Sequence, residues 1–437
     1  MKLARPCCSR LGSYGPAYIA CRALSTNPAT TASAESALRQ EPSQSQTFLD
    51  VGTRRIFNED HDAFRETCRQ FYAEEVTPEK HSEWEKAQMV PRELWKKAGD
   101  VGLLGVNCPE EYGGLGADIL FAAVTWEEQC YAKGSPTGPG FGLHSDIVMP
   151  YIVHYGSEEQ KGKYLPAMCR GEKIAAIAMT EPGAGSDLQG IRTTAKKAAD
   201  GTWVLNGSKT YITNGYLSDV VIVVARTNLE TKAAHGTSLF LVDAELAGFT
   251  KGQPLTKMGF KANDTCELFF DDVTLPADAL LGEADSGFYY LMNELPQERL
   301  QIAVEGQARG EAAFEEARAY MGERKAFGTS LYEGQQVLRH KLADMKTQLS
   351  VNRAFIDSCL ELHSRGALDT ATASMAKLHS TELCWRVVDE AVQLHGGAGF
   401  MWEYPVARNL ADCRVPRIYG GTNEIMKEVI ARTCKPV

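Results

Sequence analysis

The spacing of apolar residues divides the chain into two helical regions with a β-rich region between them. Phe64, Cys68 and Phe71 recur at intervals of four and three, which predicts helices between about 58 and 173. After Gly287 the helical spacing returns, with apolar residues at 338, 342, 345, 349, 356 and 360 and again at 376, 383, 387, 391 and 394. Both regions are therefore predicted to be packed helices.

Between these regions, short β-branched and aromatic runs alternate with turn residues. Asp200-Gly201, Asn206-Gly207 and Asn214-Gly215 separate the runs, and no long crossover helix interrupts them. Closely spaced DG and NG turns favour antiparallel hairpins. We expect an α+β multidomain fold. Its parts are an N-terminal helical domain at 55–173, a central antiparallel β domain at 174–282 and a C-terminal helical bundle at 283–437.

The first 34 residues have a composition of their own. They contain Lys2, Arg5, Arg10 and Arg22 but no acidic residue, and Ser, Thr, Ala and Cys are abundant. This composition is typical of a mitochondrial presequence, whereas a disordered tail is the alternative. We expect residues 1–34 to be a transit peptide, followed by a disordered lead-in to about residue 46.

The overall composition is that of a globular protein, with 44% hydrophobic and 23% charged residues. The formal net charge of −10 does not favour a nucleic-acid partner. No apolar run approaches the roughly 20 residues that cross a bilayer, so no transmembrane segment is expected. The 12 cysteines include no CxxC pair, so neither a disulfide framework nor a metal site is expected.

Three glycine-rich segments contain the candidate chemistry. AMTEPGAGSD at 178–187 follows a predicted strand, and free backbone N–H groups in such a loop suit an anion such as pyrophosphate. Its glycine spacing is not that of a Rossmann fingerprint. QLHGGAGF at 393–400 and IYGGTNEI at 418–425, taken singly, are explained as helix caps.

In combination, these motifs point to a family. TEPGAGSD, KTYITNG, RKAFG, QLHGGAGF and IYGGTNEI occur in this order and resemble the acyl-CoA dehydrogenase family over almost the whole chain after the presequence. Within the family, NELPQERL at 293–300 together with Gly420-Gly421 resembles the long-chain members. The resemblance implies FAD-dependent α,β-dehydrogenation of long-chain acyl-CoA to trans-2-enoyl-CoA. This is the first step of fatty acid β-oxidation in the mitochondrial matrix.

The resemblance also implies where the catalytic base lies. Many members have a glutamate directly after the tyrosine of the last motif, where this chain has Gly420. Long-chain and isovaleryl members use a glutamate on a helix near the start of the last domain, and Glu298 matches it. We expect Glu298 to stay ionised until the acyl chain expels water and raises its pKa. The backbone N–H of Gly420 is expected to donate to the thioester oxygen.

By the same resemblance, FAD lies between the β domain and the flanking helices, with its adenine half contacted by a neighbouring subunit. A homo-oligomer, usually a tetramer, is implied. Tyr211 stands where relatives commonly have tryptophan. The residues implied to contact FAD are Ile177, Ala178, Met179, Thr180, Glu181, Pro182, Gly183, Ala184, Gly185, Ser186, Tyr211, Ile212, Thr213, Arg324, Gln335, Gln393, Leu394, His395, Gly396, Gly397, Thr422, Asn423 and Glu424.

A second set of residues is implied to contact the acyl-CoA substrate. They are Ser186, Ala234, His235, Tyr289, Pro296, Gln297, Glu298, Arg299, Gly420 and Gly421. The small residues Gly134, Ser135, Gly138 and Gly140 would leave room for a long or branched tail if they lie at the end of the acyl channel, and a simple loop is the alternative.

Electron-transfer flavoprotein is the implied electron acceptor. Three alternatives remain open from the sequence. They are an isovaleryl or branched-chain acyl-CoA dehydrogenase, an acyl-CoA oxidase that passes electrons to oxygen, and an acyl-CoA-binding or assembly protein without turnover.

Overall fold

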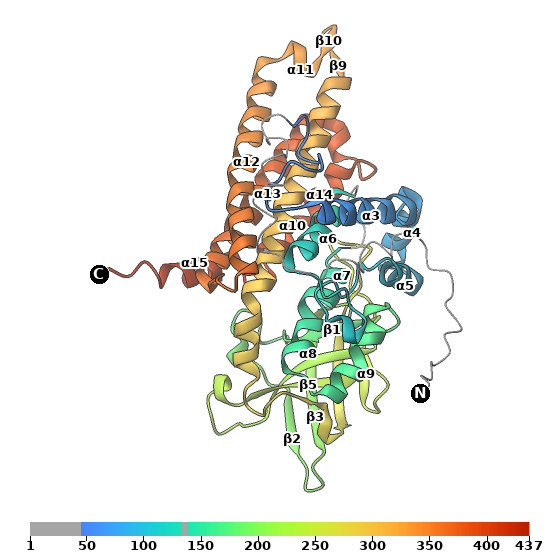
Figure 1. Cartoon of the computed structure of the whole chain (residues 1–437), viewed down its shortest axis with the longest axis vertical. Coiled ribbons are helices and arrows are strands. Elements are labelled where there is room, and N and C mark those ends of the chain that lie inside the picture. Colours follow the sequence, from blue (N-terminus) through green and yellow to red (C-terminus); the bar gives the residue numbers. More distant parts are fainter. Residues whose placement is uncertain (1–44, 133–137, 437) are drawn as a thin grey trace, which may run out of the picture.

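The computed structural model describes residues 45–132 and 138–436. In order along the chain, one set of helices precedes the sheet and another set follows it (Figure 1). The expected transit peptide, Gly134 and Ser135 lie outside the described residues. The helices before the sheet are α3 (Glu59–Glu75), α4 (Pro78–Ala87), α5 (Arg92–Asp100), α6 (Ile119–Tyr131), α7 (Gly140–Gly142), the π-helical segment η3 (Leu143–Val148), α8 (Met149–Tyr155) and α9 (Glu158–Cys169).

The sheet has the strand order β6-β7-β3-β2-β4-β5-β8, with β1 paired to β4. Its strands are β1 (Ala175–Ala178), β2 (Thr194–Lys197), β3 (Trp203–Thr213), β4 (Val220–Arg226), β5 (Thr237–Asp243), β6 (Phe249–Lys251), β7 (Thr265–Leu275) and β8 (Leu280–Leu281).

Most of this sheet is antiparallel as predicted, but two expectations were wrong in detail. β1 pairs parallel with β4, and Thr194 of β2 also pairs parallel with Arg226 of β4. Asn206-Gly207 is no hairpin turn: it lies inside the single strand β3, at a register shift. Gly207 has φ +145°, and a Cβ there would lie 2.5 Å from Thr193 Oγ1. The glycine therefore permits a close strand contact rather than a turn.

The C-terminal part begins with the 37-residue helix α10 (Gly287–Glu323), which is roughly 55 Å long. It runs from the β domain to the opposite end of the molecule, where the hairpin β9–β10 lies (Figure 1). The remaining elements are β9 (Lys325–Ala326), β10 (Thr329–Ser330), α11 (Leu331–Gly334), α12 (Gln336–Ser364), α13 (Thr370–His395), the 3₁₀ segment η7 (Gly396–Phe400), α14 (Pro405–Asp412) and α15 (Asn423–Ala431).

The buried residues join these parts. Strand β4 is apolar on both faces: Val220, Ile222 and Val224 pack with α8 and α9, whereas Val221 and Val223 pack with the rest of the sheet. A further core joins α3 and α6 to α10 and α12. Alternate residues of a strand point to opposite faces, so a continuous apolar run such as β4 requires cover on both sides. Helix α10 contacts both the sheet and the helices and is the frame on which the candidate site is built.

Candidate active site

Glu298 lies on α10 and is 6% exposed. Tyr151 of α8 donates a hydrogen bond to Glu298 Oε1 at 3.1 Å. Burial raises the pKa of Glu298 to about 7, although the bond from Tyr151 lowers it, and the charge of Glu294 one turn earlier raises it further. The expected rise of this pKa when the acyl chain binds and expels water stays a prediction. The protein matrix raises it before any substrate binds.

Glu294 is bound to the same helix α8. Its Oε1 accepts hydrogen bonds from Tyr155 and from the His154 ring, each at 2.9 Å. The bond to Glu294 raises the pKa of His154. Two carboxylates on one face of α10 are thus fixed by three polar side chains from α8, which sets the orientation of Glu298.

The Gly420-Gly421 turn lies close to this part of α10. Gly420 has φ +63°, and a Cβ there would lie 2.4 Å from Cδ1 of Ile302, which follows Glu298 by one helical turn. Arg299 Nε donates to Gly420 O at 3.5 Å. Within the described part of the chain no hydrogen bond uses the Gly420 N–H. The structure therefore brings a buried carboxylate and a free backbone donor to the same stretch of α10.

The loop after β1 is held from beneath by a buried ion pair. Lys209 Nζ donates to Glu181 Oε1 at 2.8 Å and to Met179 O at 3.0 Å. Glu181 also accepts from the N–H groups of Arg192 and Thr193 at 2.6 and 3.0 Å. Burial lowers the pKa of Lys209 to about 8, and Glu181 opposes this shift. The Glu181 side chain thus fixes the loop, and only its backbone can face a cofactor.

The outer side of this loop is open. A Cβ built on Gly183 or Gly185 meets no atom within 4 Å. Nearby, Tyr211 has φ +60° and is 69% exposed. Free loop backbone beside an exposed aromatic face fits a cofactor with a phosphate and a planar ring, as FAD has.

The other residues expected to contact FAD at the β domain fall into two groups. Met179, Thr180, Pro182, Ser186 and Thr213 are half-buried or exposed. By contrast, Ile177, Ala178, Ala184 and Ile212 of the β domain have buried side chains, and so do Leu394, His395 and Asn423 of the C-terminal bundle.

A third group of expected FAD contacts lies at the far end of α10. Arg324 is the C-cap of α10, 26 residues or roughly 39 Å along the helix from Glu298. Exposed Gln335 follows the adjacent hairpin, and His395 stacks on Tyr320 with ring centroids 4.4 Å apart. That stacking places exposed Gln393, Gly396 and Gly397 at this same end of the molecule. One chain does not bring this group and the Glu298 site together.

At the terminal motif, Thr422 caps α15 by accepting from Ile425 N at 3.3 Å, and Glu424 is exposed in its first turn. The cap follows from the sequence pattern. The Asn423 side chain is used inside the protein, where it donates to Thr381 and Glu382 at 3.0 and 2.7 Å.

Two of the expected substrate residues meet where the start of α10 contacts the β domain. Tyr289 Oη and His235 Nδ1 are 3.0 Å apart, and His235 closes the short 3₁₀ segment Ala233–His235 beside half-buried Ala234. On α10, Pro296 and Gln297 are half-buried, and Gln297 Nε2 donates to Asp146 O at 2.8 Å. On α10, Tyr289 therefore lies nearer the start of the helix than Pro296 and Gln297.

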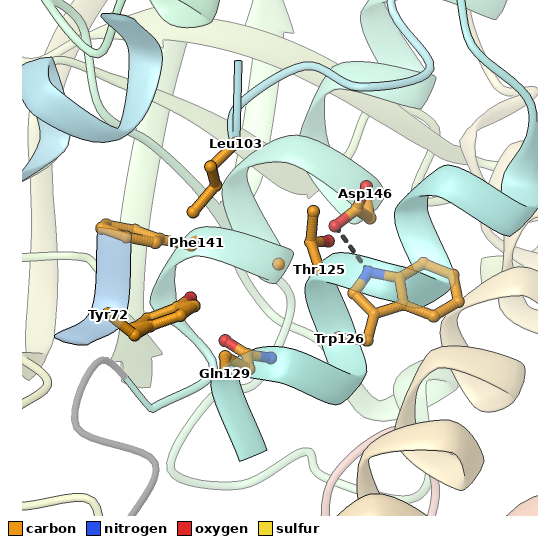
Figure 2. Close-up of a pocket in the computed structure, with 8 residues that line it drawn as sticks. Tyr72, Leu103, Thr125, Trp126, Gln129, Phe141 and Asp146 are labelled. Carbon is orange, nitrogen blue, oxygen red and sulfur yellow. Dashed lines mark hydrogen bonds between the residues drawn. The ribbon is translucent and has the colours of Figure 1, made fainter. Parts of the chain in front are cut away.

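A small cavity lies beside α6 and η3, and Figure 2 shows its lining. Trp126 Nε1 donates to Asp146 Oδ2 at 2.8 Å, whereas Asp146 Oδ1 has no partner in the described part of the chain. Burial raises the pKa of Asp146 to about 8. The cavity is lined by Tyr72, Leu103, Thr125, Trp126, Gln129, Phe141, Gly142 and Asp146.

The expected role of Gly138 and Gly140 in the acyl channel does not fit this geometry. A Cβ on Gly138 would lie 3.1 Å from Asn263 Cβ, and one on Gly140 would lie 2.7 Å from Asn263 Nδ2. These glycines allow close packing against the β domain rather than leaving open room. Gly142 lines the cavity instead.

Sequence reasoning missed Tyr151, Asp146, Gly142 and Lys377, a buried lysine beneath the Gly420-Gly421 turn. Each lies in an ordinary helical pattern, and only its partners distinguish it. Among residues 45–132 and 138–436, no helix is long and apolar enough to cross a membrane, and no cluster of metal-ligating side chains is found. No disulfide links the cysteines within residues 45–132 and 138–436, and all of them except Cys434 are buried.

Comparison with known proteins identifies the family. Three family models match the chain: the N-terminal domain of acyl-CoA dehydrogenase at 58–172, the middle domain at 176–273 and the C-terminal domain at 285–435. A mitochondrial long-chain specific acyl-CoA dehydrogenase of Mus musculus is 60% identical over 90% of this chain and 91% of its own. A mitochondrial isovaleryl-CoA dehydrogenase of Solanum tuberosum is 35% identical over 89% of this chain and 94% of its own.

The fold agrees with these matches. A crystal structure of an acyl-CoA dehydrogenase from Geobacillus kaustophilus superimposes with a TM-score of 0.84 and 45% identity, covering 88% of this chain and 100% of that one. The sequence matches, the three domains and the helical ends around a central sheet all agree. The chain therefore belongs to the acyl-CoA dehydrogenase family.

Proposed function

We propose that the protein is a FAD-dependent dehydrogenase that converts long-chain acyl-CoA to trans-2-enoyl-CoA, the first step of mitochondrial fatty acid β-oxidation. The observation that carries the proposal is the buried Glu298 carboxylate beside a glycine turn whose N–H is free. The 60% identity with a long-chain enzyme, against 35% with an isovaleryl enzyme, favours long-chain substrates.

In this proposal Glu298 removes a proton from C2, next to the thioester carbonyl. A base with a pKa near the working pH is suited to this step, and burial raises the pKa of Glu298 to about 7. When bound, FAD supplies the acceptor for the hydride that leaves C3. Removal of the proton places negative charge on the thioester oxygen, and the Gly420 N–H is the donor that stabilises it. Loss of one such donor typically costs about 3 kcal/mol.

The residues that would hold the cofactor are divided between two ends of the chain. Tyr211, Thr213 and the open loop at 183–186 would contact the flavin half. Arg324, Gln335 and the exposed part of the 393–397 turn would contact the phosphate and adenine half, for which a guanidinium is suited. Because Arg324 lies roughly 39 Å along α10 from Glu298, it would serve the site of a neighbouring copy. We therefore propose a homo-oligomer, and a tetramer as its form.

The remaining expectations form part of the same proposal. His235 and Tyr289 would contact the CoA portion, and the acyl tail would extend along α10 toward the cavity lined by Gly142. Electron-transfer flavoprotein would accept the electrons. The mitochondrial long-chain relative supports a mitochondrial location, and we place the protein in the matrix, with residues 1–34 as its transit peptide.

Anaerobic bleaching of the flavin absorbance tests the function. Wild-type protein and Glu298→Gln, each with confirmed FAD content, are mixed with palmitoyl-CoA and with isovaleryl-CoA. Exposed Glu361→Gln on α12 is the matched control. We expect wild type and the control to bleach with palmitoyl-CoA, and Glu298→Gln to bleach at least about 10²-fold more slowly.

The other outcomes separate the alternatives. Faster bleaching with isovaleryl-CoA indicates a branched-chain enzyme, and hydrogen peroxide formed in air without an acceptor indicates an oxidase. A flavin-loaded wild type that bleaches with neither substrate indicates a binding protein. Wild-type rates in Glu298→Gln would show that another group is the base.

A further inference from the structure

Lys377 of α13 is fully buried beneath the Gly420-Gly421 turn. Its Nζ donates to Gly421 O and to Asn423 Oδ1, each at 2.8 Å. No carboxylate of the described residues lies within ion-pair distance of this ammonium. Burial and the nearby charge of Arg299 lower the pKa of Lys377 to about 7. This nitrogen is therefore costly to keep charged, and it is held by two neutral hydrogen-bond acceptors rather than by an ion pair.

The partners of Lys377 are themselves fixed. Asn423 Nδ2 donates to Thr381 Oγ1 at 3.0 Å and to Glu382 Oε1 at 2.7 Å, and Glu382 pairs with Arg417 at 3.0 Å. These bonds hold the amide oxygen of Asn423 toward Lys377. The ammonium is therefore clamped between α13, the turn and the start of α15.

Arg299 holds the same turn from α10. Its Nε donates to Gly420 O at 3.5 Å, and its Nη1 donates to Ser374 Oγ at 3.2 Å. Two buried cations from two helices thus bind successive carbonyls of two glycines. Gly420 and Gly421 both have positive φ, which glycine adopts readily. Because glycine has no side chain to restrict its backbone, the conformation of this turn depends on contacts such as these.

The peptide unit between Ile418 and Tyr419 is anchored as well. The Tyr419 N–H donates to Val415 O at 3.1 Å. The peptide unit that carries the Gly420 N–H lies between this anchored unit and the Gly420–Gly421 unit, whose carbonyl Arg299 holds, and Lys377 fixes the unit that follows. Since each peptide unit is planar, fixing these neighbouring units restricts the direction of the Gly420 N–H. Of the two carbonyl contacts, that of Lys377 is the shorter, at 2.8 Å against 3.5 Å.

We propose that Lys377 is a positioning residue for the reaction. Its ammonium holds the Gly421 carbonyl so that the Gly420 N–H stays directed at the thioester oxygen. This inference rests on the proposed function. It assigns Lys377 no contact with substrate or cofactor.

The test measures the stability of a bound enolate in the flavin-loaded enzyme. A 3-ketoacyl-CoA of palmitoyl length has an acidic C2 proton, and its enolate is followed by near-ultraviolet absorbance during a pH titration. Lys377→Met removes the donor, and Lys377→Gln keeps a neutral donor. Lys251→Met is the matched control, because Lys251 Nζ also donates to two backbone carbonyls, Tyr216 O and Ser218 O, but within the β domain.

In Lys377→Met we expect the pKa of the bound ligand to rise by about one unit or more, which is a tenfold loss of enolate stability. The kcat for palmitoyl-CoA falls by about the same factor while KM is unchanged, since only the developing charge is affected. Lys377→Gln and Lys251→Met keep the wild-type ligand pKa. Should Lys377→Met not fold, Asn423→Ala, which removes the second acceptor of the ammonium, is expected to raise the ligand pKa in the same direction.

Three results would overturn the inference. One is a folded, flavin-loaded Lys377→Met, or Asn423→Ala in its place, with the wild-type ligand pKa. Another is an equal shift in Lys377→Gln, which would assign the effect to charge rather than position. The third is an equal shift in Lys251→Met. A wild type that neither binds the ligand as enolate nor oxidises palmitoyl-CoA would instead refute the proposed function.

Discussion

Tyr151 of α8 donates a hydrogen bond to Glu298 Oε1 on α10. One turn earlier on α10, Glu294 instead accepts hydrogen bonds from Tyr155 and the His154 ring. The two carboxylates therefore have separate partners on one helix. Burial raises the pKa of Glu298, the Tyr151 bond lowers it, and the Glu294 charge raises it. This balance gives pH predictions of opposite sign for the two neighbours.

Tyr151→Phe is expected to shift the acid limb of the kcat/KM profile to higher pH. The phenol hydrogen bond stabilises the ionised form of Glu298, so its loss raises the pKa above about 7. Because the proposed base acts only when ionised, activity is then lost at a higher pH as the medium is acidified. The measurement is initial rate with palmitoyl-CoA between pH 5 and 9, which spans about two units on each side. Tyr164→Phe, remote from Glu298, is the control, and a limb that stays in place would show that Tyr151 does not tune the base.

Glu294→Gln is expected to shift the same limb to lower pH. Removing the neighbouring negative charge favours the ionised form of Glu298 and lowers its pKa. The amide oxygen of glutamine can still accept from Tyr155, so the helix contact is preserved in part. The same rate profile checks this, and a shift toward higher pH would contradict the electrostatic account.

Gly420→Ala is expected to lower stability and kcat together. The positive φ costs about 1–2 kcal/mol for a residue with a Cβ, and overpacking against Ile302 Cδ1 at 2.4 Å adds about 1–3 kcal/mol. Gly366→Ala is a matched control, since Gly366 has φ +65° but no atom within 4 Å of its Cβ position. Thermal unfolding should show a larger loss for Gly420→Ala than for Gly366→Ala.

The double variant Gly420→Ala with Ile302→Val separates the two costs. Valine lacks the Cδ1 atom, so the steric part should be recovered while the cost of positive φ remains. Its stability is expected to approach that of Gly366→Ala after correction for Ile302→Val alone. No recovery would mean that the contact with Ile302 is not the source of the loss.

Glu181→Gln is expected to lower the unfolding free energy by about 3–5 kcal/mol, because it leaves Lys209 buried without an anion. Burial alone would raise the pKa of Glu181, but Lys209 and the backbone donors lower it in the folded protein. Glu181 therefore contributes stability above its unfolded pKa, and this contribution is lost as pH falls below about 4.5. Urea unfolding between about pH 2 and 7 should show this acid loss in wild type and a weaker one in the variant, with exposed Glu83→Gln behaving as wild type.

Some features of the site were predictable from the sequence, and others were not. Glu298, Gly420 and the 178–187 loop were found from motif order, and Thr422 as a cap follows from local pattern alone. Local pattern misassigned Asn206-Gly207, because an in-strand bulge and a hairpin turn use the same residues. It also could not tell that Glu181 and Asn423 turn their side chains into the protein. Side-chain direction depends on partners that local pattern does not contain.

By itself the sequence determined the order of helices and strands and the family, and it predicted Glu298 as the base, because periodicity and motifs are read over short stretches of chain. Only the tertiary structure decided the environment of the base. Tyr151 is 147 residues from Glu298, and Lys377 is 44 residues from the Gly421 carbonyl that it binds. The pKa of a buried carboxylate and the direction of a glycine N–H depend on such distant groups, which approach only when the helices pack.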